Sequence, residues 1–245
     1  MSEPTSPFLR AQWRHVAVLN YAIDPALLAP FVPAGTELDL WQGRAYLSLV
    51  GFLFLETTVL GLPVPFHRNF EEVNLRFYVR RRADDGWRRA VVFVKEIVPR
   101  AAIAFTARAL YNENYVALPM GSRREWADDD RRRLSSVEYH WRHEGRELGL
   151  RVTIADGFAL PAPGSEEEFV IEHYWGYTAQ RDGGTVEYRV EHPPWRVTAA
   201  SHAELQGDVA RFYGPPFEEA LRTAPASSFV AEGSPIVVYS GRRIP

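Results

Sequence analysis

The sequence predicts an α+β fold that is mainly β, an antiparallel or mixed β-barrel with a few helices packed on its outside. Segments in which apolar and polar residues alternate recur along the chain, and this is the period of a β-strand with two distinct faces. Turn signals rich in Gly and Asp separate these segments, and only three short stretches have helical character. No linker, internal repeat or low-complexity tract is evident, so we expect a single domain over residues 1–245, with its core at about 13–241.

The composition is that of an ordinary globular protein and excludes several classes of function. The 245 residues are 46% hydrophobic, 13% aromatic and 24% charged, which excludes disorder and collagen-like repeats. With 31 acidic and 28 basic residues the net charge is -3, so nucleic acid and anionic membranes are not expected partners. Cysteine is absent, which excludes disulfides and thiolate metal sites. No signal peptide or membrane-spanning stretch is evident, and we expect a cytoplasmic protein.

The N-terminal part predicts a strand, a short helix and a hairpin. A strand is expected over 15–21. The Asp-Pro pair at 24–25 marks the start of a helix over 26–31, because Asp caps helix N-termini and Pro is tolerated in the first turn. A Gln-Gly turn at 42–43 indicates a hairpin that runs into a largely buried strand over 45–55.

Two neighbouring strands carry the most informative pattern. In the first (70–82) an apolar set alternates with polar residues and occupies one face: Val73, Leu75, Phe77 and Val79. An Asp-Asp-Gly turn at 84–86 leads into the second strand (88–99), which is apolar on both faces and is therefore predicted to be central. Strict alternation would place two sets on opposite faces: Val91, Phe93, Lys95 and Ile97 on one, and Val92, Val94, Glu96 and Val98 on the other.

The remaining chain predicts one helix, two hairpins, a second short helix and a last strand. Pro99 precedes an Ala-rich helix over 101–110. Hairpins follow over 137–154, with a Glu-Gly turn, and over 167–197, with an Asp-Gly-Gly turn. A short helix is expected within 200–214, before the strand that begins at Pro235.

Several blocks together resemble one known family. They are WRHVAVLNYAIDPALLAPFVPAGTELDLWQGRAYLSLVGF, FEEVNLRFYV, VKEIVPRAAIAFTARALYNENY and HYWGY, and the resemblance runs from about Trp13 to about Gly241. The chain is similar to the YqjF-like bacterial proteins, a group of unknown function (domain of unknown function 2071) in the acetoacetate decarboxylase-like superfamily. The resemblance implies a cone-shaped β-barrel with a central cavity and flanking helices.

The resemblance does not carry decarboxylase chemistry to this chain. The characterised decarboxylases of the superfamily use a cavity lysine in a proline–lysine–lysine context. By block order that context falls near VALPMGS, where Leu118, Pro119 and Met120 stand without a lysine. A glutamate and an arginine in the pocket of that superfamily resemble Glu72 and Arg76 in order and setting.

Lys95 is the single lysine of the chain and is one candidate for chemistry. A lysine desolvated in an apolar strand can become a neutral amine that attacks a carbonyl, with Glu72 or Glu113 transferring protons. The alternative is structural, since Lys95 would also be stabilised by pairing with a carboxylate such as Glu72 or Glu113.

Two groups of residues are candidates for ligand binding. Glu72, Asn74 and Arg76 share one strand face, which would orient a carboxylate or carbonyl ligand if that face points into the barrel. The alternative is that this face meets solvent. Arg108, Glu113 and Tyr115 belong to a polar, aromatic cluster that could close one end of the barrel, or could form a helix C-cap with ordinary salt links.

Other motifs point to structure or are absent. Alternation places His173, Trp175 and Tyr177 on one strand face, where large aromatic residues are typical of a barrel wall. His140 and His143 point to opposite faces of a strand and make a poor metal pair. Neither a phosphate-binding Gly-rich loop nor a nucleophile elbow occurs, so no cofactor or metal is expected.

Three functions therefore compete at this stage. One is an enzyme that acts on a small carbonyl or carboxylate compound through imine chemistry at Lys95. The second is a module that binds a small hydrophobic or aromatic molecule without reaction. The third is an assembly role, in which exposed aromatic residues such as Trp87 or Trp126 join copies of the chain as a homo-oligomer.

Overall fold

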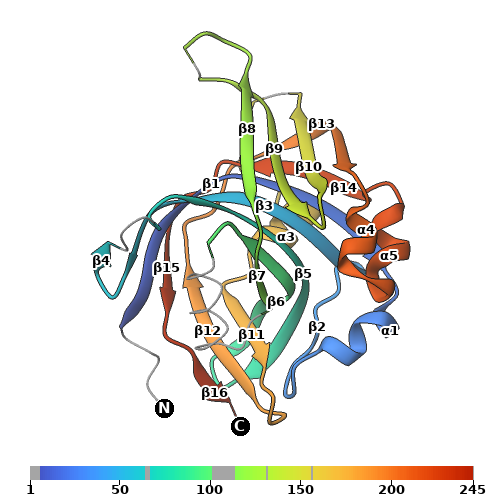
Figure 1. The fold of residues 1–245 in the computed structure, drawn as a ribbon. Helices are drawn as coiled ribbons and strands as arrows, with labels where there is room; N and C mark the ends of the chain where they lie inside the picture. Colours follow the sequence, from blue (N-terminus) through green and yellow to red (C-terminus); the bar gives the residue numbers. More distant parts are fainter. Residues whose placement is uncertain (1–5, 64–66, 101–113, 131, 156, 245) are drawn as a thin grey trace.

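Seven strands of the computed structural model, which describes residues 6–63, 67–100, 114–130, 132–155 and 157–244, form a closed circuit of hydrogen-bonded neighbours (Figure 1). Every pair in the circuit is antiparallel except β6 with β11. In circuit order the strands are β1 (Pro7–Ile23), β3 (Ala45–Val59), β5 (Phe70–Ala83), β6 (Gly86–Val98), β11 (Trp175–Ala179), β12 (Thr185–Glu191) and β15 (Pro235–Tyr239), which returns to β1.

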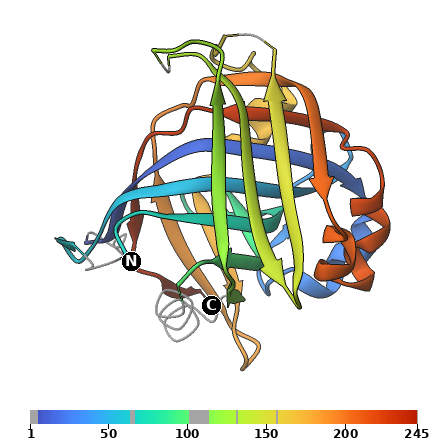
Figure 2. The ribbon, with the colours of Figure 1, turned by 45° about the horizontal axis from the view of Figure 1, so that its top comes forward.

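A second layer of strands lies across the outside of this circuit (Figure 2). It branches from β1 and continues through β14, β13, β10, β9 and β8, all antiparallel. These strands are β14 (Ser227–Ala231), β13 (Val197–Gln206), β10 (Arg146–Ile154), β9 (Leu134–His143) and β8 (Met120–Trp126). Four short strands add to the sheet edges: β2 (Glu37–Leu38), β4 (Leu62–Pro63), β7 (Tyr115–Ala117) and β16 (Arg242–Ile244).

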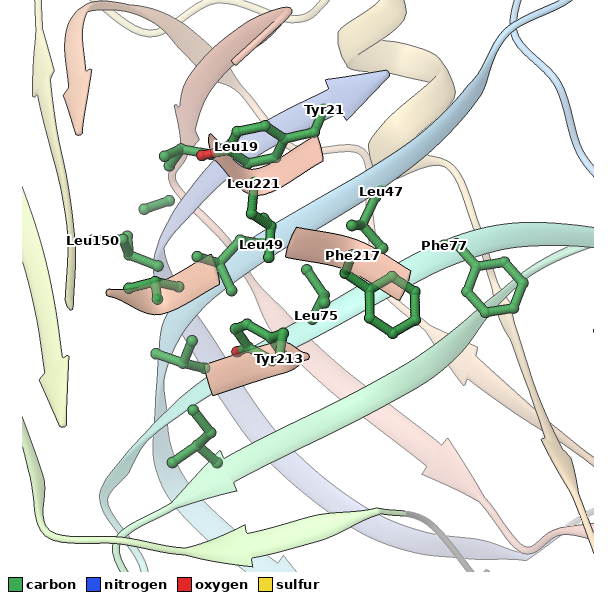
Figure 3. Packing of buried hydrophobic residues seen from close by; sticks show 14 of the residues in the cluster. Leu19, Tyr21, Leu47, Leu49, Leu75, Phe77, Leu150, Tyr213, Phe217 and Leu221 are labelled. Atoms are coloured by element: carbon green, nitrogen blue, oxygen red, sulfur yellow. The ribbon is translucent and has the colours of Figure 1, made fainter. Parts of the chain in front are cut away.

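The two layers give the molecule two apolar cores, and alternation along β3 and β5 divides residues between them. Leu47 and Leu49 of β3 and Leu75 of β5 pack outward against the second layer, together with residues such as Leu150 (Figure 3). The intervening positions of β3, such as Val50, point inward to the other cluster. The cluster that meets the second layer is the outer core, and the cluster inside the circuit is the inner core. Both faces of the wall are therefore buried, which explains why β3 is apolar at almost every position.

The described part of the chain contains four short α-helices that pack against the sheet. They are α1 (Pro25–Leu28), which continues as a 3₁₀ turn (Ala29–Phe31), then α3 (Glu166–Ile171), α4 (Val209–Tyr213) and α5 (Pro215–Arg222). The side chain of Asp24 accepts a hydrogen bond from Ala26 N at 2.9 Å, as expected for its capping role. Tyr213, Phe217 and Leu221 bring α4 and α5 into the outer core (Figure 3). No helix among the described residues is long and apolar enough to cross a membrane.

The structure confirms the mainly β fold with few helices and corrects three local predictions. Residues 166–171 are helical, although we expected a strand, because Ser165 caps three consecutive glutamates in the first turn. The short helix expected within 200–214 is α4, and it is confined to Val209–Tyr213, because residues 200–206 belong to strand β13. Helix α5 was not expected, and Pro215 occupies its first turn. The helix expected over 101–110 lies outside the described residues.

A buried carboxylate joins four strands of the sheet. Glu187 of β12 accepts hydrogen bonds from Arg88 at 2.6 Å, Arg242 at 2.9 Å and the Tyr177 hydroxyl at 2.7 Å. The guanidinium of Arg88 also stacks 4.1 Å from the ring centroid of Trp175. This network ties β6, β11, β12 and β16 together and fixes the ring of Trp175 on the inner side of the circuit.

The outer core leaves no room for a side chain at Gly51 of β3. A Cβ there would lie 2.5 Å from Cδ2 of the buried Tyr139, whose hydroxyl donates to His15 O at 2.8 Å. We therefore expect Gly51→Ala to lower the free energy of unfolding by about 1–3 kcal/mol, as for other overpacked cores. Chemical denaturation measures this. Gly157→Ala is the matched control, because no heavy atom lies within 4 Å of its Cβ position, and equal stability of the two variants would contradict the prediction.

Candidate functional site

A cavity of about 370 Å³ lies inside the closed circuit of strands, and every strand of the circuit contributes to its wall. The wall is mostly aromatic and aliphatic, and α3 supplies Val170 and Ile171. Its aromatic residues are Phe8, Trp13, Phe52, Phe54, Phe70, Phe93, Tyr115, Trp175, Tyr188 and Trp195. A cavity of this size and lining suits a small, largely apolar organic molecule.

The polar face of β5 points into this cavity. Glu72, Asn74 and Arg76 line it, at alternate positions of the strand. Glu72 accepts a hydrogen bond from Asn74 Nδ2 at 3.1 Å and one from the Tyr115 hydroxyl at 3.2 Å. The amide oxygen of Asn74 is buried and has no hydrogen-bond partner within the described residues. The structure thus brings together four of the residues that the sequence suggested for a site.

Arg76 is a cation in this wall without a described counter-charge. Its Nε is buried and lacks a hydrogen-bond partner, and its guanidinium forms no ion pair with a residue in the described ranges. The guanidinium carbon lies 5.8 Å from the centroid of the Tyr78 ring, so an aromatic face is its described contact. Since a buried charge is stabilised by an opposite charge, this position favours an anionic ligand.

A β-bulge in β6 changes which charged residue faces the cavity. Arg76 pairs with Phe93 and Leu75 pairs with Lys95, so Val94 has no partner across the ladder. The strict alternation expected for this strand is therefore wrong beyond Phe93. Val91, Phe93 and the buried Glu96 line the cavity, whereas Lys95 turns to the other side.

Lys95 lies in the outer core, against α4. Its Nζ donates a hydrogen bond to Phe212 O at 2.9 Å and lies 4.2 Å from the centroid of the Phe212 ring. Burial lowers the pKa of Lys95. The structure does not place Lys95 with Glu72, and it forms no described ion pair. Glu113 and Arg108 lie outside the described residues.

His173 and Asp39 form a buried pair that the sequence analysis missed. His173 lines the cavity, and its Nε2 lies 3.3 Å from Oδ2 of Asp39, which also accepts a hydrogen bond from Arg89 Nε at 2.7 Å. The other ring nitrogen, Nδ1, is buried without a hydrogen-bond partner among the described residues. The histidine and the aspartate are separated by 134 positions, so spacing in the sequence gives no signal for the pair.

Aromatic residues carry two further polar atoms at this wall. The indole Nε1 of Trp13 is buried and has no hydrogen-bond partner within the described ranges. The ring of Trp195 stacks on His192 with centroids 4.3 Å apart, and Trp195 Nε1 donates to Ser234 Oγ at 2.8 Å. Trp13 is therefore a candidate donor for a ligand, whereas the indole N–H of Trp195 is already used.

Comparison with known proteins identifies the family. A family model for the uncharacterised conserved proteins called DUF2071 matches residues 10–242. The chain belongs to this family. The uncharacterised protein YqjF of Bacillus subtilis (strain 168) is 34% identical over 79 residues, which is 32% of this chain and 33% of that protein. The DUF2071 chain thus matches about a third of the length of this curated relative, and the expected family resemblance is confirmed.

Solved structures confirm the predicted acetoacetate decarboxylase-like fold. The enduracididine biosynthesis enzyme MppR, in complex with pyruvate, has a TM-score of 0.68 at 15% identity, covering 98% of this chain and 91% of that one. Acetoacetate decarboxylase from Legionella pneumophila subsp. pneumophila str. Philadelphia 1 has a TM-score of 0.66 at 10% identity, covering 100% and 90%. At these identities the likeness shows the fold alone.

Buried histidines predict how the stability of the DUF2071 protein depends on pH. Burial, with the charges of nearby arginines, lowers the pKa of His15 to about 4, and burial also lowers the pKa of His173 to about 4 despite its bond to Asp39. Burial lowers the pKa of His192 as well. In the unfolded chain the imidazoles become protonated below their ordinary pKa of 6.5, whereas in the folded protein His15 and His173 stay neutral until about pH 4.

We therefore expect the free energy of unfolding to fall as pH drops from 6.5 towards 4, by up to about 1.4 kcal/mol per pH unit for each histidine. Denaturant titrations across this range measure the slope. His15→Asn should make it shallower, because asparagine tolerates the positive φ of 54° at this position and does not titrate. Replacement of the exposed His202 by Gln is the control. A stability that stays constant between pH 6.5 and 4 would contradict the expectation.

Proposed function

We propose that this DUF2071 protein binds a small organic anion with an apolar body inside the circuit of strands, and that Arg76 holds the anionic group. The single observation that carries the proposal is the guanidinium of Arg76 at the cavity wall, with a buried Nε and no described ion pair. Guanidinium groups bind carboxylates through two parallel hydrogen bonds, so a carboxylate is the favoured anion.

The rest of the wall sets the character of the ligand body. Aromatic rings from β1, β3, β5 and β6 surround the cavity, and they contain few free hydrogen-bonding groups. Burial of an apolar ligand surface against them contributes roughly 25 cal/mol per Å² before the entropy lost on binding. A substituted aromatic or branched aliphatic acid fits both the volume of about 370 Å³ and the guanidinium of Arg76, the one arginine among the described lining residues.

The structural neighbours support a small acid as the first class of ligand to test. MppR has been solved with pyruvate, a small carboxylate with a carbonyl group, and the other neighbour is named for acetoacetate. These proteins share only the fold with the DUF2071 chain, so their ligands serve here as probes.

Imine chemistry at Lys95 has no part in this proposal. An imine with a cavity ligand needs the amine nitrogen next to the carbonyl carbon, but the Nζ of Lys95 donates to Phe212 O in the outer core. The function proposed is therefore binding without covalent attachment, with the carboxylates at Glu72 and Glu96 as the acidic groups of the wall.

Replacement of Arg76 tests the proposal directly. We expect Arg76→Gln to weaken the binding of benzoate or phenylpyruvate by about 10-fold to 100-fold, since a hydrogen bond to a charged group contributes about 1.5–3 kcal/mol. Titration calorimetry measures this, with uncharged benzamide as the matched ligand. Arg146→Gln on the exposed β9–β10 turn is the control variant.

The same replacement should leave the free protein at least as stable as the wild type. A partly buried guanidinium without a described counter-charge is unfavourable until an anion binds, so thermal unfolding of unliganded Arg76→Gln should occur at an equal or higher temperature.

Equal affinity of wild type and variant for benzoate, or equal affinity of wild type for benzoate and benzamide, would refute the role of Arg76.

Reductive trapping separates binding from imine chemistry. Because Lys95 is the single lysine, incubation with pyruvate or phenylpyruvate and cyanoborohydride followed by peptide mapping gives a clear result. We expect the N-terminal amine to be labelled, and this serves as the internal positive control. We expect no labelling of Lys95 that a cavity ligand such as benzoate can block. Labelling of Lys95 that benzoate blocks would show an amine within reach of the cavity and would contradict the assignment.

A further inference from the structure

We propose that His173, oriented by Asp39, is a hydrogen-bond acceptor in the cavity, so that the ligand carries a hydroxyl or N–H donor in addition to its anionic group. This inference rests on the proposed function, because it describes the second recognition element of the same cavity. It narrows the ligand class from any small apolar acid to an acid that also donates a hydrogen bond.

The pair with Asp39 determines which nitrogen of His173 carries the proton. Burial alone would raise the pKa of Asp39, but the hydrogen bonds from His173 and Arg89 outweigh this and hold it below its usual value. Asp39 is therefore a carboxylate, which can only accept hydrogen bonds. The proton of a neutral His173 must lie on Nε2, which faces Asp39 at 3.3 Å, and Nδ1 is left with an unshared electron pair.

The charges around His173 keep the ring neutral at physiological pH. Burial is the largest cause that lowers its pKa, to about 4, and the positive charges of Arg89 and Arg76 lower it further. Asp39 is the acidic group that opposes them. The rings of Tyr78 and Phe169 pack against the imidazole with centroids 4.6 and 5.2 Å away and supply no charge. A neutral ring with Nε2 protonated is an acceptor at Nδ1.

The acceptor is buried and has no partner, so it is specific for a donor. Nδ1 of His173 makes no hydrogen bond within the described residues, and the ring itself lines the cavity whereas Asp39 does not. A buried acceptor without a partner is unfavourable by about 1–3 kcal/mol, and a ligand donor would remove that penalty. A ligand without a donor would leave it in place.

One small ligand can reach both recognition elements. The ring of Tyr78 lies next to each of them, since the Arg76 guanidinium carbon is 5.8 Å and the His173 ring 4.6 Å from its centroid. The positive charge of Arg76 also lowers the pKa of His173, so the two groups are close enough to interact electrostatically. An acid with a hydroxyl on its body can therefore contact Arg76 and His173 together.

The first experiment compares benzoate with its 2-, 3- and 4-hydroxy isomers and the corresponding methoxy compounds by titration calorimetry. We expect one hydroxy isomer to bind about 2-fold to 10-fold more tightly than benzoate, which is the contribution of one ordinary hydrogen bond. The methoxy compound of the same substitution pattern lacks a donor and should lose that advantage. If benzoate binds and no hydroxy isomer is preferred, the inference fails while the proposed function stands.

Two variants connect the preference to His173. His173→Phe should lose the preference for the hydroxy isomer, measured within this variant as the ratio of its dissociation constants for benzoate and for the hydroxy isomer. Asp39→Asn should reduce the preference without replacing the ring, because an amide can donate to Nε2 and shift the imidazole proton to Nδ1. His202→Gln, on the exposed part of β13, is the control. A preference that survives in His173→Phe would overturn the inference.

Nitrogen NMR of the wild-type protein labelled with ¹⁵N-histidine tests the tautomer of His173 before any ligand is added. We expect the Nδ1 signal of His173, assigned by its loss in His173→Phe, to be that of an unprotonated ring nitrogen at pH 7, and to move when the preferred hydroxy isomer is added. A protonated Nδ1 would overturn the inference even if no benzoate binds. Failure of every acid to bind, with an unprotonated Nδ1, would instead contradict the proposed function.

Discussion

The whole arrangement depends on the ability of β1 to pair with both layers. Its first half is hydrogen-bonded to β15 and its second half to β14, while β3 runs along its other edge for nearly the full length. The change of partner occurs near His15, a residue with positive φ. The turn between β14 and β15 is tied to β1 at this point, because Ser234 O accepts a hydrogen bond from Trp13 N at 2.9 Å and Gly233 O accepts one from the Arg14 side chain at 3.0 Å. Pairing of the first half of β1 with β15 closes the circuit, and pairing of its second half with β14 starts the second layer. Without the first pairing, the circuit would have an open edge and the cavity would have no continuous wall.

Burial of both faces of the wall explains where the unsatisfied polar atoms occur. The outward face of β5 meets the second layer and is apolar, so its polar residues point inward. Among the described buried polar atoms without a partner, five belong to cavity-lining residues and three lie elsewhere. The first group is Trp13, Thr57, Asn74, Arg76 and His173, and the second is His140, Trp141 and Tyr213. Such atoms reduce the stability of the empty protein. The cavity-lining atoms share one surface next to open space, where a ligand can reach them, whereas the atoms of Trp141 and Tyr213 are enclosed in the outer core.

Local patterns in the sequence predicted the strands, most turns and the shared face of Glu72, Asn74 and Arg76, because the period of a strand is fixed by backbone geometry. The same logic failed at Val94, where one unpaired residue exchanges the faces of Lys95 and Glu96. A bulge depends on the register of the neighbouring strand, which composition does not encode. The pair of His173 and Asp39 could not be predicted for a related reason, since it forms only when the segment between α3 and β11 meets the segment after β2 in space.

The closed circuit also has a consequence for the speed of exchange. Each strand of the wall is hydrogen-bonded on both sides, so a molecule cannot pass between two strands unless several ladder bonds break. A ligand must therefore enter and leave at an end of the circuit, where the lining residues Phe8 and His67 are partly exposed. The residence time of a bound molecule is then set by motion at that end, and tight retention can be achieved without high intrinsic affinity.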